Sequence, residues 1–72
     1  MSLEARYEKL LKKIGQNLKR ARILRRLTQE DMIGLGFNYR HYQQLESGRY
    51  SPSLHTLFRL AEALKVDVKD LL

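Results

Sequence analysis

Apolar residues spaced three and four positions apart run through most of this 72-residue chain, and no stretch shows the alternation typical of a β-strand. The longest series covers residues 3–25 and consists of Leu3, Tyr7, Leu10, Leu11, Ile14, Leu18 and Ala21. Another covers residues 54–64 and consists of Leu54, Leu57, Phe58, Ala61 and Leu64. Each series predicts a helix with one apolar face, which must be covered by another element. We therefore expect an all-α fold around one small core.

Capping signals divide the region between these two helices. Thr28 and Asp31 match the reciprocal cap that starts many helices. In that cap the Thr28 hydroxyl accepts from the backbone N–H of Asp31, and the Asp31 carboxylate accepts from the backbone N–H of Thr28. The helix that follows is short, because Gly34 and Gly36 end it after roughly two turns. Asn38 is a second helix start, and it predicts a third helix over residues 39–46.

The loop after this third helix and the end of the chain complete the prediction. Gly48 is suited to the positive φ of a helix C-terminus, and Pro52 prevents helix through the residue before it. Ser53 caps the helix over residues 54–64, and Asp67 caps a last short turn through Val68, Leu71 and Leu72, which we count as the fifth helix. The sequence thus predicts five helices and no strand.

Positive charge is concentrated at one end of the chain. The formal net charge is +6, and residues 1–26 hold nine basic and two acidic residues, an excess of seven. Such asymmetry indicates a polyanionic partner, nucleic acid first and an acidic membrane second, although a charged helix face that keeps a small protein in solution explains it too. The basic residues nearly ring the first helix instead of leaving a broad apolar face, which disfavours the membrane.

The composition also bears on the compartment. No apolar run approaches the length of about 18 residues that a membrane span needs. The opening residues, MSLEARYEKL, mix polar and charged side chains, unlike a signal peptide. The chain has no cysteine, which excludes disulfides and a thiolate zinc site. These features predict a cytoplasmic protein.

The third predicted helix carries a polar stripe without a carboxylate. Arg40, Gln43, Gln44 and Ser47 stand at i, i+3, i+4 and i+7, so they share one helix face. Glutamine can form two hydrogen bonds to adenine and arginine two to guanine, whereas a carboxylate would be repelled by phosphate. Taken alone, such a stripe is more often an ordinary hydrated surface. The capped helix and glycine turn before it favour base reading, because so short a connection makes two helices cross steeply.

Five segments of the sequence carry a family resemblance: IGQNLKRAR, LTQEDM, LGFNYRHYQQLESG, SPSLHTLFRLAEAL and VDVKDLL. Together they resemble the phage-repressor and Cro-like helix-turn-helix domains of bacterial and phage transcriptional regulators. The resemblance implies a compact five-helix, lambda-repressor-like DNA-binding domain over residues 14–72, preceded by a helical extension over residues 1–13. In one departure, the stretch from Thr28 to Gly36 is a residue shorter than usual, which predicts a truncated second helix.

The resemblance also implies roles for individual residues. The expected base-reading residues are Tyr39, Arg40, Gln43 and Gln44. The expected phosphate-contacting residues are Thr28, Gln29, Ser47 and Arg49, and Gln29 should also brace the third helix. An ion pair between Arg22 and Glu46 is expected to tie the first helix to the end of the third. The helical register agrees, because it places Glu46 beside core-facing residues, where a carboxylate needs a cationic partner.

Other chemistry is weakly supported by this sequence. His41 and His55 fall on different predicted helices without a nearby cysteine, so we expect exposed histidines and no metal site. Glu30 and Asp31 resemble an acid–base pair, but acidic residues are favoured in the first turn of any helix. The chain has no nucleophile motif, no phosphate-binding glycine loop and little room for a pocket. We therefore expect no enzyme, no cofactor and no small-molecule ligand.

The sequence accordingly predicts a regulator that binds specific double-stranded DNA and places residues 39–47 in the major groove. A module of this size buries little surface, so we expect a homodimer on a palindromic operator. The expected dimer surface is Val68, Leu71 and Leu72, which exceed what one small core can bury. The alternative is a protein-interaction module, antitoxin-like or adaptor-like, for which DNA is secondary. The sequence has no extra apolar segment dedicated to such a partner.

Overall fold

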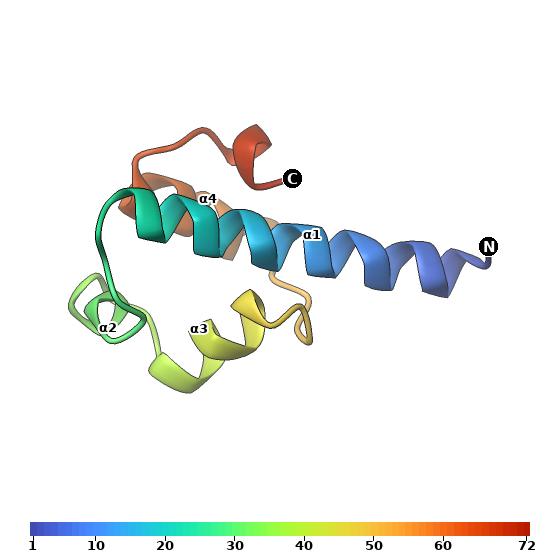
Figure 1. The fold of residues 1–72 in the computed structure, drawn as a ribbon, viewed down its shortest axis with the longest axis horizontal. Coiled ribbons are helices and arrows are strands. Elements are labelled where there is room, and N and C mark those ends of the chain that lie inside the picture. Colours follow the sequence, from blue (N-terminus) through green and yellow to red (C-terminus); the bar gives the residue numbers. More distant parts are fainter.

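A computed structural model describes residues 1–72 as four α-helices followed by one 3-10 turn (Figure 1). The elements in chain order are α1 (Leu3–Leu24), α2 (Asp31–Gly34), α3 (Tyr39–Glu46), α4 (Leu54–Leu64) and η1 (Val68–Leu71). The all-α prediction is confirmed. The prediction of five α-helices is wrong, because the last element is a tight turn closed by bonds between residues three apart, such as Asp70 N to Asp67 O at 2.9 Å.

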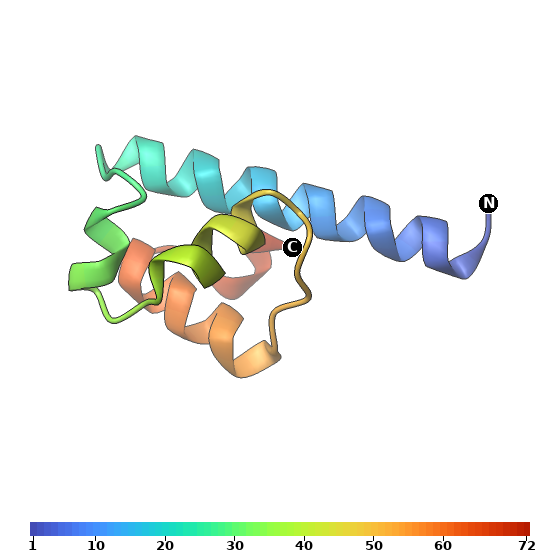
Figure 2. The ribbon, with the colours of Figure 1, turned by 90° about the horizontal axis from the view of Figure 1, so that it is seen from below.

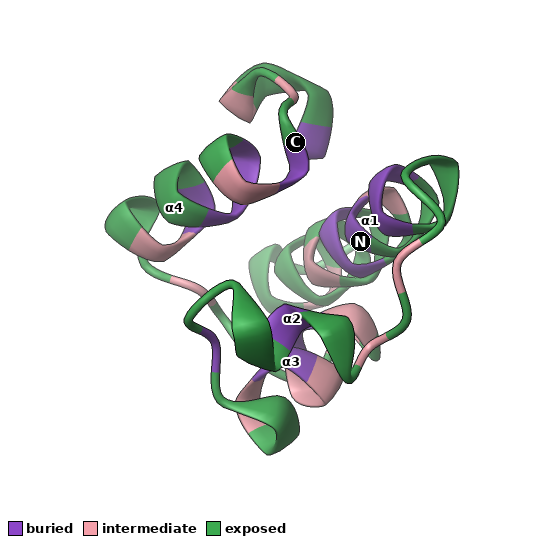
Figure 3. Cartoon of the chain, turned by 90° about the vertical axis from the view of Figure 1, so that its left-hand side faces the viewer, coloured by how far each residue is buried: buried purple, intermediate pink, exposed green.

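The core lies where the apolar faces of α1, α3 and α4 meet. In Figure 2, which views the molecule from below, α3 lies in front of the space between α1 and α4, and Figure 3 shows that the buried parts of these helices face inward. The core residues are Ile14, Leu18, Ala21, Met32, Phe37, Tyr42, Leu45, Leu57, Leu60, Ala61, Leu64 and Leu71. Full burial of one large apolar side chain contributes about 1.5–3 kcal/mol, so this cluster is the main source of stability.

The long helix α1 crosses α3 at Gly15. This glycine is buried, and a Cβ added to it would lie closer than 3.0 Å to the carbonyl oxygens of Leu45 and Glu46. Only a residue without a side chain lets the two backbones come so close. Gly15 therefore does not interrupt α1, and it is the point where α1 receives the end of α3.

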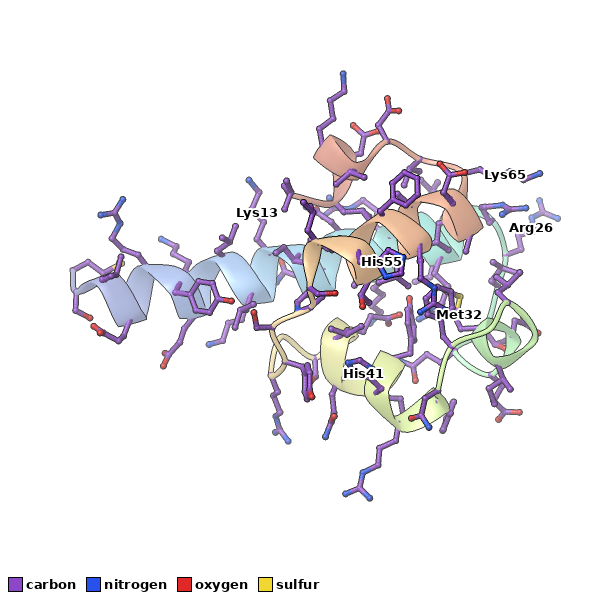
Figure 4. All side chains as sticks on the ribbon, turned by 180° about the vertical axis from the view of Figure 1, so that it is seen from behind. Lys13, Arg26, Met32, His41, His55 and Lys65 are labelled. Carbon is purple, nitrogen blue, oxygen red and sulfur yellow. The ribbon has the colours of Figure 1, made fainter.

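The short helix α2 runs across the end of α3 and not alongside it (Figure 2). It is α-helical for four residues only, which agrees with the predicted truncation and is shorter than the two turns expected. The backbone on either side of it closes through bonds between residues three apart, including Met32 N to Gln29 O at 3.2 Å. Met32 is completely buried and anchors α2 in the core (Figure 4). Gly36, with a φ of 97°, then turns the chain into α3.

The two ends of the chain differ in their packing. The N-terminal part of α1 extends beyond the rest of the molecule, and its Tyr7 hydroxyl is hydrogen-bonded to Ser51 in the loop after α3. At the other end Leu71 is completely buried within the single chain, Val68 is half-buried and Leu72 is exposed. The prediction that Leu71 exceeds what one small core can bury, and therefore lies at a dimer surface, is wrong. None of the helices has the length and apolar character required to cross a bilayer.

Candidate nucleic-acid interface

Two anchors in the core and a cap at its start fix the orientation of α3. The Asn38 side chain accepts a hydrogen bond from the backbone N–H of His41 at 2.9 Å, which satisfies one of the free donors of the first turn. Tyr42 and Leu45 are buried, with 1% and 2% of their surface exposed. Because these two residues hold one face of a short helix against the core, the opposite face must point outward.

The outward face of α3 forms an open hollow on the surface. Its lining residues are Arg40, Gln43, Gln44, Ser47 and Arg49, all of them among the predicted DNA-contacting residues. Arg40, Ser47 and Arg49 are exposed, and no carboxylate lines the hollow. Tyr39 stands next to it at the start of α3, with 36% of its surface exposed. The structure thus brings the stripe together as a basic, hydrogen-bonding surface that suits the major groove of DNA.

A buried ion pair joins α1 to the end of α3. Arg22 donates to the Glu46 carboxylate through Nε at 2.8 Å and through Nη2 at 2.9 Å, and the two side chains are 10% and 4% exposed. A third bond, from Arg22 Nη1 to the Leu27 carbonyl at 2.7 Å, secures the segment after α1. The structure therefore brings together the predicted pair, in the two-pronged arrangement that suits a guanidinium and a carboxylate.

The ion pair also governs the ionisation of its members. Hydrogen bonding to Glu46 raises the pKa of Arg22. Burial opposes ionisation of Glu46, but the hydrogen bonds that its carboxylate accepts from Arg22 and Gln29 hold its pKa below the ordinary value. Burial raises the pKa of the neighbouring Tyr42 phenol, which keeps that side chain neutral. The pair is consequently charged throughout the neutral pH range.

A series of amide hydrogen bonds leads from this pair to the outward face of α3. Gln29 donates through Nε2 to Glu46 Oε1 at 3.2 Å, and the side-chain oxygen of Gln29, Oε1, accepts from Gln43 Nε2 at 3.1 Å. Gln43 Nε2 also donates to the hydroxyl oxygen of Tyr39 at 3.0 Å. We call the five residues Arg22, Glu46, Gln29, Gln43 and Tyr39 the polar relay.

The four predicted phosphate-contacting residues differ in what they can offer. The side chain of Arg49 makes no hydrogen bond within the chain, and Gln29 keeps one amide hydrogen for a ligand. Thr28 forms the predicted reciprocal cap, in which its hydroxyl accepts from Asp31 N at 3.1 Å and its N–H donates to the Asp31 carboxylate at 2.7 Å. Ser47 donates its hydroxyl hydrogen to the Gln44 carbonyl at 2.8 Å, so it must release that bond to donate elsewhere.

One residue that positions the site has no signal in the sequence. Arg59 on α4 donates to the Gly36 carbonyl at 3.1 Å, and its guanidinium lies 4.8 Å from the centroid of the Phe37 ring. This exposed contact ties the turn between α2 and α3 to α4. Only the fold brings Arg59 to a turn 23 positions earlier, so helical spacing cannot reveal it.

The two histidines lie on separate helices and form no common site (Figure 4). His55 is exposed, as expected, whereas His41 is half-buried because its ring packs edge-on against Tyr50 with centroids 4.6 Å apart. The expectation of an exposed side chain is wrong for His41. The structure contains no group of three or more potential ligands that could hold a metal ion.

A short helix that crosses the end of a second one, with a carboxylate-free polar face turned outward, defines the helix-turn-helix class of DNA-binding domains. Comparison with known proteins agrees with this class. The model of the helix-turn-helix family HTH_3 matches residues 18–71, and the chain belongs to that family.

Two relatives extend the comparison. The chain is 41% identical over 56 residues to the uncharacterized HTH-type transcriptional regulator y4dJ of Sinorhizobium fredii, which covers 76% of this chain and 73% of the relative. The structure of the present chain resembles the crystal structure of the restriction-modification controller protein C.AhdI of Aeromonas hydrophila, with a TM-score of 0.81 and 32% sequence identity. That match covers 86% of this chain and 96% of the controller protein.

Proposed function

We propose that this protein is a sequence-specific, DNA-binding transcriptional regulator that inserts residues 39–47 into the major groove. The observation that carries the proposal is the hollow lined by Arg40, Gln43, Gln44, Ser47 and Arg49, which is held outward by the core anchors of α3. Guanidinium and amide groups on one rigid helix face match the hydrogen-bonding pattern of base edges. Membership of the helix-turn-helix family and the similarity to a transcriptional regulator support the same function.

Within this surface we propose a division between residues that read bases and residues that hold the backbone. Tyr39, Arg40, Gln43 and Gln44 lie along the helix and would face base edges. Arg49 lies just past the C-terminal end of α3, where a side chain meets the phosphates that flank the groove. Phosphate contacts supply most of the affinity of such a module, so binding should weaken steeply as salt rises.

Two substitutions test this division. Gln44→Ala should cost about 1–3 kcal/mol on the preferred site and relax the choice of base at one position, because a base-specific contact is lost. Arg49→Ala should weaken binding to all sequences about equally and reduce the salt dependence of binding by about one phosphate contact. Sites would first be selected from a random DNA pool, and affinities then measured at two salt concentrations. Identical behaviour of the two variants would contradict the division, and weak binding without sequence preference would favour a protein-interaction module.

We further propose that the functional unit is a homodimer on a palindromic operator. Two exposed apolar residues, Leu54 and Phe58, lie one turn apart on α4, and η1, which packs against α4, is followed by the exposed Leu72. A patch of this kind on a small chain is a natural contact for a second copy. Val68 and Leu72 remain in the proposed interface. Leu71 supports it from the core, since it is not accessible to a partner.

We propose a separate role for the extension formed by residues 1–13, which precedes a DNA-binding domain over residues 14–72. Four basic side chains of the extension point into solvent: Arg6, Lys9, Lys12 and Lys13. Its base is held against the loop after α3, because the Cα of Gly48 approaches Lys12 so closely that an added Cβ would lie 2.9 Å from the Lys12 Cα. The extension thus brings positive charge towards the side of the domain that carries Arg49, which favours association with DNA.

A further inference from the structure

Of the two glutamines in the stripe, Gln43 is the one whose side-chain donors are already used within the protein. Its Nε2 donates to Gln29 Oε1 at 3.1 Å and to the Tyr39 hydroxyl oxygen at 3.0 Å. A primary amide has two hydrogens and one carbonyl oxygen, so only the acceptor remains for a ligand. Gln44 lines the same hollow, and its amide makes no hydrogen bond within the chain. The two neighbouring glutamines therefore present different chemistry to DNA.

The orientation of the Gln43 amide follows from the charge of the buried ion pair. Arg22 occupies both oxygens of Glu46 with donated hydrogen bonds, and the carboxylate can only accept. Gln29 must therefore turn its NH₂ group towards Glu46, because its carbonyl would otherwise face an anionic oxygen. That choice leaves the Gln29 carbonyl for Gln43, which in turn must approach with its own NH₂ group.

Building on the proposed DNA-binding function, we infer that the polar relay makes Gln43 a hydrogen-bond acceptor towards DNA, selecting a base that carries an exocyclic amine. In the major groove those amines are N6 of adenine and N4 of cytosine. Guanine and thymine carry an oxygen, O6 or O4, at the position of that amine. This oxygen cannot donate a hydrogen bond to the Gln43 carbonyl and repels it. The two-bond recognition of adenine typical of glutamine needs a free donor for N7, which Gln43 lacks and Gln44 has. Gln43 thus accepts adenine or cytosine about equally on the strand it faces.

Tyr39 keeps this selection broad. Its hydroxyl oxygen accepts the second hydrogen of Gln43, while its own hydrogen is left for a phosphate or a base acceptor. Removing the hydroxyl frees one N–H of Gln43 but leaves the bond to Gln29 in place. The freed donor can reach N7 of adenine, and cytosine offers no equivalent acceptor. Tyr39→Phe should therefore convert a two-base preference into a preference for adenine.

The experiment uses the full chain and a binding site selected from a random DNA pool. Gln43→Ala first identifies the base pair that this side chain contacts, as the position at which discrimination is lost. Affinities of the wild-type protein, Tyr39→Phe and the control Tyr50→Phe are then measured on four sites that differ only at that pair. The control removes a phenol hydroxyl that lies outside the polar relay. For the wild-type protein and the control we expect adenine and cytosine to bind within about threefold of each other and clearly above guanine and thymine.

Tyr39→Phe should raise the ratio of adenine to cytosine binding by at least about fivefold, the lower end of what one well-placed base contact contributes. Gln29→Ala is the second variant: it releases the orientation of Gln43, so guanine and thymine should be tolerated better than by the wild-type protein. A wild-type preference for guanine or thymine at this pair, or an unchanged adenine-to-cytosine ratio in Tyr39→Phe, would overturn the inference while leaving DNA binding intact. A protein with no sequence preference at all would instead refute the proposed function, and the inference with it.

Discussion

At the scale of single residues, Glu46 shows how a charge can be kept inside so small a core. Its carboxylate accepts from Arg22 and Gln29, and these bonds hold its pKa below the ordinary value despite burial. A carboxyl group with a lowered folded-state pKa adds stability above its unfolded pKa of about 4.3, and this contribution is lost as the pH falls through the folded-state value. The ion pair should therefore be a source of acid sensitivity.

Glu46→Gln tests this expectation. At neutral pH we expect the free energy of unfolding to fall by about 3 kcal/mol, because Arg22 is left buried without a counter-charge. The difference between the variant and the wild-type protein should shrink as the pH is lowered from about 5 to about 3.5. Asp31 also has a lowered pKa, caused by its hydrogen bonds to Thr28, but it is present in both proteins and cancels. Urea titrations across this pH range give the comparison, and a difference independent of pH would contradict it.

Gly15 and Gly34 form a matched pair of helical glycines with opposite surroundings. Gly15→Ala would press a methyl group against the carbonyl oxygens of Leu45 and Glu46, whereas an added Cβ at Gly34 has no neighbour within 4 Å. We expect Gly15→Ala to destabilise the protein by about 1–3 kcal/mol despite the better helix propensity of alanine. Gly34→Ala should stabilise it by up to about 1 kcal/mol. Thermal unfolding of both variants checks the prediction, which requires opposite signs.

At the scale of elements, the caps of α3 and α4 should differ in their effect on DNA binding. Asn38→Ala removes the bond to His41 N from a helix of eight residues, and Ser53→Ala removes the equivalent bond to Thr56 N from a helix of eleven. Each should cost about 1 kcal/mol of stability. Only Asn38→Ala should also weaken DNA binding clearly, because fraying begins at the end that carries the base-reading residues. Equal losses of affinity in the two variants would show that the cap does not pre-organise the reading helix.

The sequence predicts these elements well where periodicity and caps agree. The starts at Asn38 and Ser53 are visible in the sequence and are found in the structure. The predicted apolar faces are confirmed only in part: Leu57, Ala61 and Leu64 of α4 are buried, as is the second half of the α1 series. Leu54 and Phe58 are exposed, and Leu60 lies in the core although the predicted face omits it. The length of α2 was overestimated because propensity does not reveal that the backbone around it adopts bonds between residues three apart. For the same reason the sequence does not reveal that the last short turn, η1, is 3-10 helical: a cap residue marks a start but does not fix the kind of turn that follows.

At the scale of the whole molecule, the proposed dimer rests on exposed apolar surface outside the stripe. Phe58→Lys should shift the protein towards monomer and weaken operator binding, because a buried contact between copies would receive two like charges. Ile33→Lys is the control, since Ile33 on α2 is 54% exposed against 51% for Phe58 and gains the same charge. Sedimentation over a range of concentrations, without DNA, reports the difference. A monomeric wild-type protein at the concentrations that saturate an operator would rule out the dimer.

The arrangement of the site was only partly predictable from the sequence. The stripe on α3 follows from helical spacing, and the need of Glu46 for a cationic partner follows from a carboxylate on the core side of a helix. The choice of Arg22 as that partner comes from the family resemblance. The resemblance also predicts that Gln29 braces α3, and the structure shows the bond from Gln43 to Gln29 that does so. The role of Arg59 and the bond from Gln43 to Tyr39 are not predicted, because they depend on how the elements meet. The burial of Leu71 is not predictable for a similar reason, since it depends on how η1 folds back over α1 and α4.

The polar relay bears on how regulators of this kind diverge. A lineage could acquire a new operator by replacing Gln29 while the base-reading residues of α3 stay the same, because the Gln29 carbonyl determines how the Gln43 amide is turned. Two homologues with identical residues in the groove would then recognise different promoters. Assigning target genes across a genome from the groove-facing residues alone would group such homologues together, and including position 29, which precedes α2, would separate them.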